Sequence, residues 1–280
     1  GMYGLDVARR RGVPAVGSFH TDFVSYLPFY GLSGFEFQGW RYLRWFYDRC
    51  RTTFAPSADT RAKLQRHGIH RVELWERGID RRAFSPAFRS ESLRRQLGAP
   101  ERPVLLYVGR LVREKNLLDL VAATERLAQL GDRFTLALVG DGPMTAELKR
   151  LLPAAHFAGF QQGADLARWY ASADLFVFPS TTETFGNVIL EAFASGLPVV
   201  TVDRGGVRDL VKPGENGVLA RPGLPDDFAR QIHDLLARPA ALRELGAGAL
   251  QTAARYQWPA VNRRLLDGYR ELLPQTARAA

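Results

Sequence analysis

Short apolar runs alternate with longer helical patterns from residue 101 onward, and this alternation constrains the fold more than any other feature. Runs such as VLLYVG (104–109), FTLALVG (134–140), LFVFPS (175–180) and PVVTV (198–202) lack polar alternation, as expected of strands buried on both faces. The segments between them, for example residues 116–130, have the length and periodicity of helices. The pattern predicts a parallel sheet wrapped by helices, the doubly wound α/β architecture, in which ligands bind beyond the carboxyl ends of the strands.

The first 85 residues show the same rhythm in shorter form. Three strands are recognisable, VPAVGSF (13–19), TTFAPS (52–57) and VELW (72–75), with helical patterns between them. Because three strands make half of such a domain, and because the first residue is Gly and not Met, we expect an N-terminally incomplete part of a longer protein. The predicted organisation is a partial N-terminal lobe (1–85), a second α/β domain (86–257) and a closing helix that returns toward the first lobe (258–280), with a linker at 76–90.

The composition is that of a globular protein. Of the 280 residues, 46% are hydrophobic and 24% are charged, which excludes fibrous, low-complexity and wholly disordered chains. No apolar run is long enough to cross a bilayer, and no secretory signal is recognisable. The single cysteine, Cys50, cannot form an intrachain disulfide. We therefore expect a cytoplasmic protein.

The formal net charge of +9 is unevenly distributed. Residues 1–100 carry 17 Lys and Arg against 9 Asp and Glu, whereas residues 101–280 carry 21 against 20. The excess favours attraction to an anionic surface such as a membrane, although a solvated basic face is the alternative. Residues 35–50, FEFQGWRYLRWFYDRC, combine aromatic residues with arginines, which suits either the inner face of a membrane or a core helix with a basic outer side. No nucleic-acid-binding motif accompanies the charge, so we expect no nucleic-acid partner.

An anion site is predicted where VLLYVG passes into GRLVREKN. Gly109, Arg110 and Lys115 lie at this strand–loop–helix junction. A glycine that allows close backbone approach, two cations and the amides at a helix start suit phosphate groups. The alternative is a polar loop with surface cations.

The stretch TTETFGNVILEAFASGLPVV carries two glutamates. Glu191 is the one acidic group in an otherwise apolar helix expected near 186–195, and an ionised carboxylate there needs a partner. That partner is either a structural donor or a vicinal diol of a ligand, whose hydroxyls a carboxylate accepts side by side. Glu183 precedes the helix, and TFGN between them supplies backbone amides. The layout suits a sugar joined to a nucleotide.

These motifs, together with VGDGP (139–143), YASADLFVFPS (170–180), SFHTDF (18–23), APSADT (55–60) and LWERGIDRRAFSP (74–86), strongly resemble the retaining glycosyltransferases of family 4 with the GT-B fold. The EX7E spacing from Glu183 to Glu191 and the closing Tyr256-x-Trp258 are part of the resemblance. The HTDF and LWERGID segments are most similar to the branch of sulfoquinovosyl-diacylglycerol synthases and lipid mannosyltransferases. The resemblance implies two Rossmann-like lobes, the first only partly present.

The resemblance also implies roles for individual residues. Arg110 and Lys115 would bind the donor diphosphate beside Gly109, Glu183 the donor sugar and Glu191 the ribose. Other residues implied in donor binding are the backbone from Phe185 through Gly186 and Asn187 to Val188, Asp141 in the crevice, and Phe160 and Gln161 beside the base.

The implied catalytic residues are His20, Glu183, Arg110 and Lys115. His20 matches the family histidine that faces the sugar, whereas an isolated histidine at a strand end is more often structural. Thr21 and Asp22 are weaker candidates for shaping the same loop. No metal and no cofactor are expected, because cations and a helix dipole stabilise the leaving diphosphate.

The resulting hypothesis is a metal-independent retaining hexosyltransferase. It would move a hexose from GDP-mannose or a UDP-sugar to a glycan or lipid hydroxyl, with peripheral attachment to the membrane as a further hypothesis. A sugar-nucleotide epimerase or a phosphorylase would bind similar ligands, but the TFGN helix start and the HTDF segment argue against both. The alternative is a non-catalytic nucleotide-sugar-binding fragment or pseudo-enzyme, because the glycine-rich acceptor loop that normally opens a GT-B enzyme is not recognisable.

Overall fold

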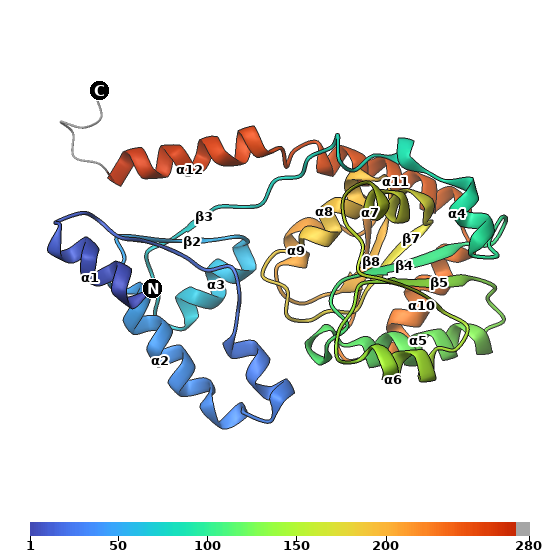
Figure 1. Ribbon diagram of the computed structural model, residues 1–280, viewed down its shortest axis with the longest axis horizontal. Helices are drawn as coiled ribbons and strands as arrows, with labels where there is room; N and C mark the ends of the chain where they lie inside the picture. Colours follow the sequence, from blue (N-terminus) through green and yellow to red (C-terminus); the bar gives the residue numbers. More distant parts are fainter. Residues whose placement is uncertain (273–280) are drawn as a thin grey trace. The chain divides into compact units, whose positions relative to one another are not determined.

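Parallel strands in two separate sheets organise the chain (Figure 1). The computed structural model describes residues 1–272, and these divide into two units. The first comprises residues 1–78 with 258–272, and the second comprises residues 79–257. The predicted α/β architecture with parallel sheets is confirmed in both.

The first unit has a three-stranded sheet in the order β1-β2-β3. Val16 lies opposite Thr52, and Thr53 lies opposite Val72. Its small core forms around Phe19, Tyr47, Leu64 and Ile69. The elements are α1 (Met2–Arg10), β1 (Val16–Ser18), the 3-10 helices η1 (Val24–Tyr30) and η2 (Ser33–Phe35), α2 (Glu36–Tyr47), β2 (Thr52–Ala55), α3 (Ala58–Arg66), β3 (Val72–Leu74) and α12 (Trp258–Leu272).

The C-terminal helix α12 packs within this first unit. Its Tyr269 ring lies 5.8 Å from the Phe54 ring, and Arg264 forms a 2.5 Å ion pair with Glu76. These contacts join residues roughly 200 positions apart in the chain. Residues 273–280 of the predicted closing segment lie outside the described residues.

The second unit contains a six-stranded parallel sheet in the order β6-β5-β4-β7-β8-β9. The order reverses between β4 and β7, which in doubly wound folds marks the ligand crevice. Helices α5, α6 and α10 lie on one face of the sheet, and α7, α8 and α11 lie on the other (Figure 1). Its elements are η3 (Pro86–Phe88), α4 (Glu91–Gln96), β4 (Val104–Val108), η4 (Arg113–Lys115), α5 (Leu117–Gln129), β5 (Thr135–Val139), α6 (Thr145–Leu151), β6 (His156–Gly159), α7 (Gly163–Ser172), β7 (Leu175–Phe178), α8 (Asn187–Ala194), β8 (Val199–Val202), α9 (Val207–Leu210), β9 (Gly217–Ala220), α10 (Pro225–Leu236) and α11 (Pro239–Ala253).

Two strands of this sheet were not apparent from the apolar runs. Strands β6 and β9 are four residues long, lie at the two edges of the sheet and contain Gly and Ala in place of a continuous Val or Leu run. The four central strands are fully buried, and they are the ones whose sequences were recognisable. An edge strand has one strand neighbour and is less enclosed, so its sequence carries a weaker signal.

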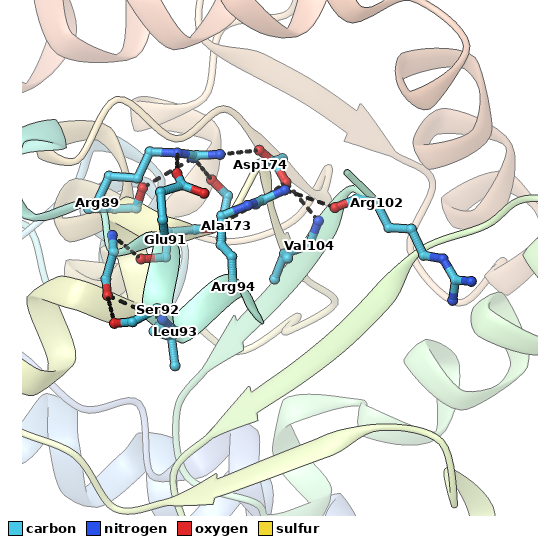
Figure 2. Close-up of polar contacts among 12 residues, drawn as sticks. Arg89, Glu91, Ser92, Leu93, Arg94, Arg102, Val104, Ala173 and Asp174 are labelled. Carbon is cyan, nitrogen blue, oxygen red and sulfur yellow. Dashed lines mark hydrogen bonds and ion pairs between the residues drawn. The ribbon is translucent and has the colours of Figure 1, made fainter. Parts of the chain in front are cut away.

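A buried arginine ties α4 to the amino-terminal edge of the sheet. Arg94 donates to Asp174 Oδ2 at 2.7 Å and to the carbonyl oxygens of Ser172 and Arg102 at 2.9 Å each (Figure 2). The same Asp174 oxygen accepts from the Val104 amide at 2.8 Å. This network joins the starts of β4 and β7 at the edge opposite the carboxyl ends of the strands.

Candidate functional site

Glycines allow the loops after β4 and β5 to pack backbone against backbone. Gly140 has φ of 133°, and a Cβ atom there would lie 2.0 Å from the Gly109 carbonyl oxygen. A Cβ atom on Gly142 would lie 2.4 Å from the Leu111 carbonyl oxygen. Neither position has room for a side chain. The glycines therefore expose main chain at the carboxyl ends of the two strands.

Lys115 and Glu183 meet beyond the end of β4. Lys115 Nζ forms an ion pair with Glu183 Oε1, and the side chains are only 13% and 15% exposed. Ser180 Oγ donates to the same carboxylate oxygen at 2.7 Å. Two residues predicted from separate motifs, 68 positions apart, thus form one polar centre.

Arg110 extends from the same loop into solvent. Its side chain is 66% exposed, and its guanidinium lies 3.5 Å from the buried carboxylate of Glu114. Its carbonyl oxygen accepts a 3.0 Å hydrogen bond from Tyr107. The hydrogen bond from Tyr107 therefore fixes the backbone at Arg110, while the guanidinium stays accessible to an anion.

The loop that carries Glu183 is held by hydrogen bonds from both sides. Thr181 Oγ1 donates to Asn116 Oδ1 at 2.8 Å, and Thr182 Oγ1 donates to the Glu114 carbonyl at 3.0 Å. The Gly206 amide donates to the Glu183 carbonyl at 2.7 Å. These contacts fix the Glu183 backbone, and its side chain then reaches Lys115.

Helix α8 begins directly after this loop. Gly186, with φ of 103°, is its N-cap, and Phe185 is buried against the Tyr256 ring at 6.0 Å. Asn187 is exposed and Val188 is half-buried, so the first turn of the helix reaches the surface. The amides of a first helical turn have no intrahelical acceptor and attract negative charge.

Glu191 lies one turn further along α8. Tyr170 donates to its Oε2 atom at 2.8 Å. Burial raises the pKa of Glu191 from 4.5 to about 7, and the bond from Tyr170 acts in the opposite direction. The structure therefore supplies a structural donor, and the carboxylate remains costly to ionise, which is typical of a group kept for function.

The remaining donor-side candidates lie in the loops after β5 and β6. Asp141 Oδ1 accepts from Thr145 Oγ1 at 2.6 Å and from the Gly142 amide at 2.7 Å, and these bonds lower the pKa of Asp141. Asp141 thus organises the turn that leads into α6. Phe160 is 74% exposed, and Gln161 donates to the Ala158 carbonyl at 2.8 Å.

His20 follows β1 in the first unit. Its ring contacts the Trp75 ring at 5.3 Å, and its Nε2 pairs with Ser18 Oγ. Burial, with a smaller effect of Arg77, lowers the pKa of His20 from 6.5 to about 4. The imidazole is consequently neutral near pH 7.

The loop after His20 is anchored by Asp22, which is buried. Its carboxylate forms an ion pair with Lys63 and accepts from Ser25 Oγ at 2.6 Å. Lys63 is therefore the partner of Asp22, and a role of Asp22 in shaping this loop stays a prediction. Lys63, Asn116, Tyr170 and Ser180 were not singled out as functional in the sequence, because an isolated polar or aromatic residue gives no signal of a contact partner distant in the chain.

A parallel doubly wound unit with a cation–carboxylate centre and a helix start at its switch point is an arrangement in which α/β proteins bind nucleotides. Two family models match the chain, "Glycosyltransferase Family 4" over residues 1–83 and "Glycosyl transferases group 1" over residues 102–238. The GDP-mannose-dependent alpha-mannosyltransferase of Mycolicibacterium smegmatis is 38% identical over 98% of this chain and 71% of its own length. The sulfoquinovosyl transferase SQD2 of Arabidopsis thaliana is 35% identical over 93% of this chain and 52% of its own.

Among solved structures, Anabaena Alr3699/HepE in complex with UDP and glucose superposes with a TM-score of 0.81. It is 25% identical, and the match covers 95% of this chain and 74% of that one. The chain belongs to glycosyltransferase family 4 and has the GT-B fold. It is a nucleotide-sugar-dependent glycosyltransferase of that retaining family.

Proposed function

We propose that this protein transfers a hexose from a nucleotide-diphosphate sugar to an acceptor hydroxyl without a metal ion. The observation that carries the proposal is the Lys115–Glu183 pair beside the exposed Arg110. A bound diphosphate would take Lys115 and Arg110 as its cations, and Glu183 would be released toward the hydroxyls of the sugar. The relatives named for GDP-mannose favour that donor.

In the proposed reaction, the bond from the anomeric carbon to the diphosphate oxygen breaks and the acceptor oxygen bonds to that carbon from the same face. The acceptor proton passes to the departing diphosphate, so no side-chain nucleophile is required. Negative charge grows on the diphosphate as the bond breaks, where Lys115, Arg110 and the start of α8 would stabilise it. His20, neutral near pH 7, suits a hydrogen bond to a sugar hydroxyl.

The acceptor that we propose is a membrane lipid. Aromatic side chains around α2 are exposed, among them Phe35 at 59%, Phe37 at 74% and Tyr42 at 51%. Arg41 and Arg44 are also exposed on this helix, whereas Trp40, Leu43, Phe46 and Tyr47 pack toward the core. The inward side of the helix belongs to the core of the first unit, and the membrane proposal rests on the exposed side. No helix within residues 1–272 is long and apolar enough to cross a bilayer.

A transfer assay tests the enzyme proposal. The protein is incubated with labelled GDP-mannose, UDP-glucose or UDP-galactose and a lipid extract, and label in the lipid fraction is measured. Lys115→Met should lower transfer at least about a hundredfold, because it removes charge stabilisation of the transition state. Lys212→Met, which removes an exposed lysine elsewhere in the second unit, is the matched control. Donor binding without transfer to any acceptor would instead support a non-catalytic binding protein.

A further inference from the structure

Tyr170 is a fully buried tyrosine on α7 whose hydroxyl reaches the neighbouring helix. It donates to Glu191 Oε2 at 2.8 Å. Its ring packs against the Phe84 and Phe176 rings, each with a centroid distance of 5.7 Å. These contacts come from the sheet and from the segment that precedes η3, so the ring is enclosed on several sides. A tyrosine has two side-chain torsions, and packing of this kind fixes both.

The hydroxyl binds one oxygen of the carboxylate only. Within residues 1–272, no hydrogen bond to Glu191 Oε1 accompanies the bond from Tyr170 to Oε2. A glutamate has three rotatable bonds, and without a partner its carboxylate would sample several orientations. The bond to Tyr170 selects one orientation and leaves Oε1 as the acceptor for another group.

The pKa shifts of Tyr170 and Glu191 suit a hydroxyl that always donates and a carboxyl group whose strength as an acceptor depends on pH. Burial raises the pKa of Tyr170 well above its ordinary value, so the hydroxyl keeps its proton throughout the physiological range. Burial raises the pKa of Glu191 to about 7, and the bond from Tyr170 lowers it. Loss of the Tyr170 hydroxyl would therefore leave more of Glu191 protonated at neutral pH.

We propose that Tyr170 is a positioning residue for the nucleoside diphosphate, because its hydroxyl orients the Glu191 carboxylate and keeps it available as an acceptor for the ribose diol. The inference rests on the proposed function and on the role that the family resemblance implies for Glu191, the binding of the ribose. A protonated carboxyl group is a weaker acceptor than a carboxylate, and a rotated one would turn Oε1 away from the ribose hydroxyls. Tyr170 thus contributes to affinity for ribose without touching the ligand.

The experiment compares Tyr170→Phe with the parent protein by calorimetry. The probes are GDP, 2′-deoxy-GDP and 3′-deoxy-GDP, titrated between pH 6 and pH 9. In the parent protein, GDP should bind more tightly than either deoxy analogue. In Tyr170→Phe, affinity for GDP should fall about five- to tenfold at pH 7, affinity for the analogues should fall less, and the pH midpoint of GDP binding should rise.

Tyr47→Phe is the matched control. Tyr47 is a buried tyrosine of the first unit, and its hydroxyl donates to the Ser18 carbonyl at 3.2 Å. Both variants lose a buried tyrosine hydroxyl, so a general effect of that loss on packing or on the free energy of unfolding would appear in both. The preference for GDP over its deoxy analogues and the pH midpoint should change in Tyr170→Phe and not in Tyr47→Phe.

A second replacement addresses the case in which Tyr170→Phe does not fold. Replacing Tyr170 by 3-fluorotyrosine keeps the hydroxyl and makes it a stronger donor, so the pH midpoint of GDP binding should fall. An unchanged ribose preference and an unchanged midpoint in these variants would overturn the inference, provided that Glu191→Gln loses the preference. If Glu191→Gln itself keeps the parent preference for ribose, the proposed role of Glu191 fails, which is a different outcome.

Discussion

Glu183 has a partner that competes with the ligand we propose for it. Its carboxylate is paired with Lys115. Any diphosphate that binds Lys115 has to draw the ammonium away from Glu183, at an electrostatic cost. In the proposed site, the pair would link recognition of the phosphate to recognition of the sugar.

Glu183→Gln should separate these two events. Removing the competing charge leaves Lys115 unpaired, so free GDP should bind about two- to tenfold more tightly than to the parent protein. GDP-mannose should lose this gain or bind more weakly, because the acceptor for its sugar hydroxyls is weakened. Calorimetry with both ligands measures the difference, and Glu125→Gln on the exposed side of α5 is the control. Parallel changes for GDP and GDP-mannose would contradict the assignment of Glu183 to the sugar.

Replacing Glu191 by a neutral residue should stabilise the fold at a pH where the carboxyl group is ionised. The pKa of Glu191 is raised from 4.5 to about 7, so its contribution to stability is present below pH 4.5 and is lost as the pH rises through 7. Glu191→Gln should accordingly raise the free energy of unfolding at pH 8 by about 1–3 kcal/mol, and the gain should vanish near pH 4.5. Urea unfolding at the two pH values measures it.

The same variant should bind nucleoside diphosphate more weakly. A functional group that destabilises the fold should, when it is replaced, give higher stability together with lower affinity for nucleoside diphosphate. A variant that unfolds more easily at pH 8 would instead mark Glu191 as a structural carboxylate.

At the scale of elements, the site depends on how closely two loops approach. The loops after β4 and β5 come together because Gly140 and Gly142 carry no side chains where they meet the carbonyl oxygens of Gly109 and Leu111. The loop after β7 is tied to the loop after β8 by the bond from the Gly206 amide to Glu183. The strand ends alone would leave Arg110 and Lys115 on a less constrained loop.

Gly140→Ala should be severely destabilising. The added methyl group would lie 2.0 Å from a backbone oxygen, at a φ that disfavours any side chain, so we expect a loss of at least about 3 kcal/mol. Gly131→Ala is the matched control, because Gly131 also has a positive φ, of 84°, but has open space around the added atom. It should cost about 1 kcal/mol. Equal losses in chemical unfolding of the two variants would show that backbone strain, and not the contact between loops, explains the effect.

At the scale of the whole molecule, the uneven charge and the exposed aromatic side chains occur in the same part of the sequence. The basic excess lies in residues 1–100, where exposed Phe37, Tyr42 and Trp45 project from α2. Aromatic rings and guanidinium groups together suit the headgroup region of an anionic bilayer. This combination is the physical basis of the proposed lipid acceptor.

Co-sedimentation with vesicles tests the membrane proposal. The protein should bind vesicles that contain anionic lipid, and added salt should release it because the attraction is screened. Replacing Arg41, Arg44 and Arg49 together by Gln should lower the bound fraction several-fold. A control that replaces three exposed arginines of the second unit, Arg126, Arg133 and Arg150, removes the same net charge. Equal losses in the two triple variants would reduce the effect to net charge, and equal binding to neutral vesicles would contradict the proposal.

The sequence by itself determined the central sheet and the candidate residues. Uninterrupted apolar runs predicted β4, β5, β7 and β8, because a strand buried on both faces needs apolar side chains on both. The resemblance to family 4 predicted that Arg110, Lys115 and Glu183 belong to one site. The apolar runs and the family motifs both lie in short stretches of sequence, so they can be recognised without knowledge of the fold.

The tertiary structure decided which of these residues meet and in what state. The pairing of Lys115 with Glu183 and the bond from Tyr170 to Glu191 join different elements, and each depends on how helices and loops pack around the sheet. The raised pKa of Glu191 follows from burial, which belongs to the packed molecule and not to the residue. Local sequence sets the chemistry that a side chain can offer. Its partners and its protonation depend on neighbours that only folding brings within a few ångströms.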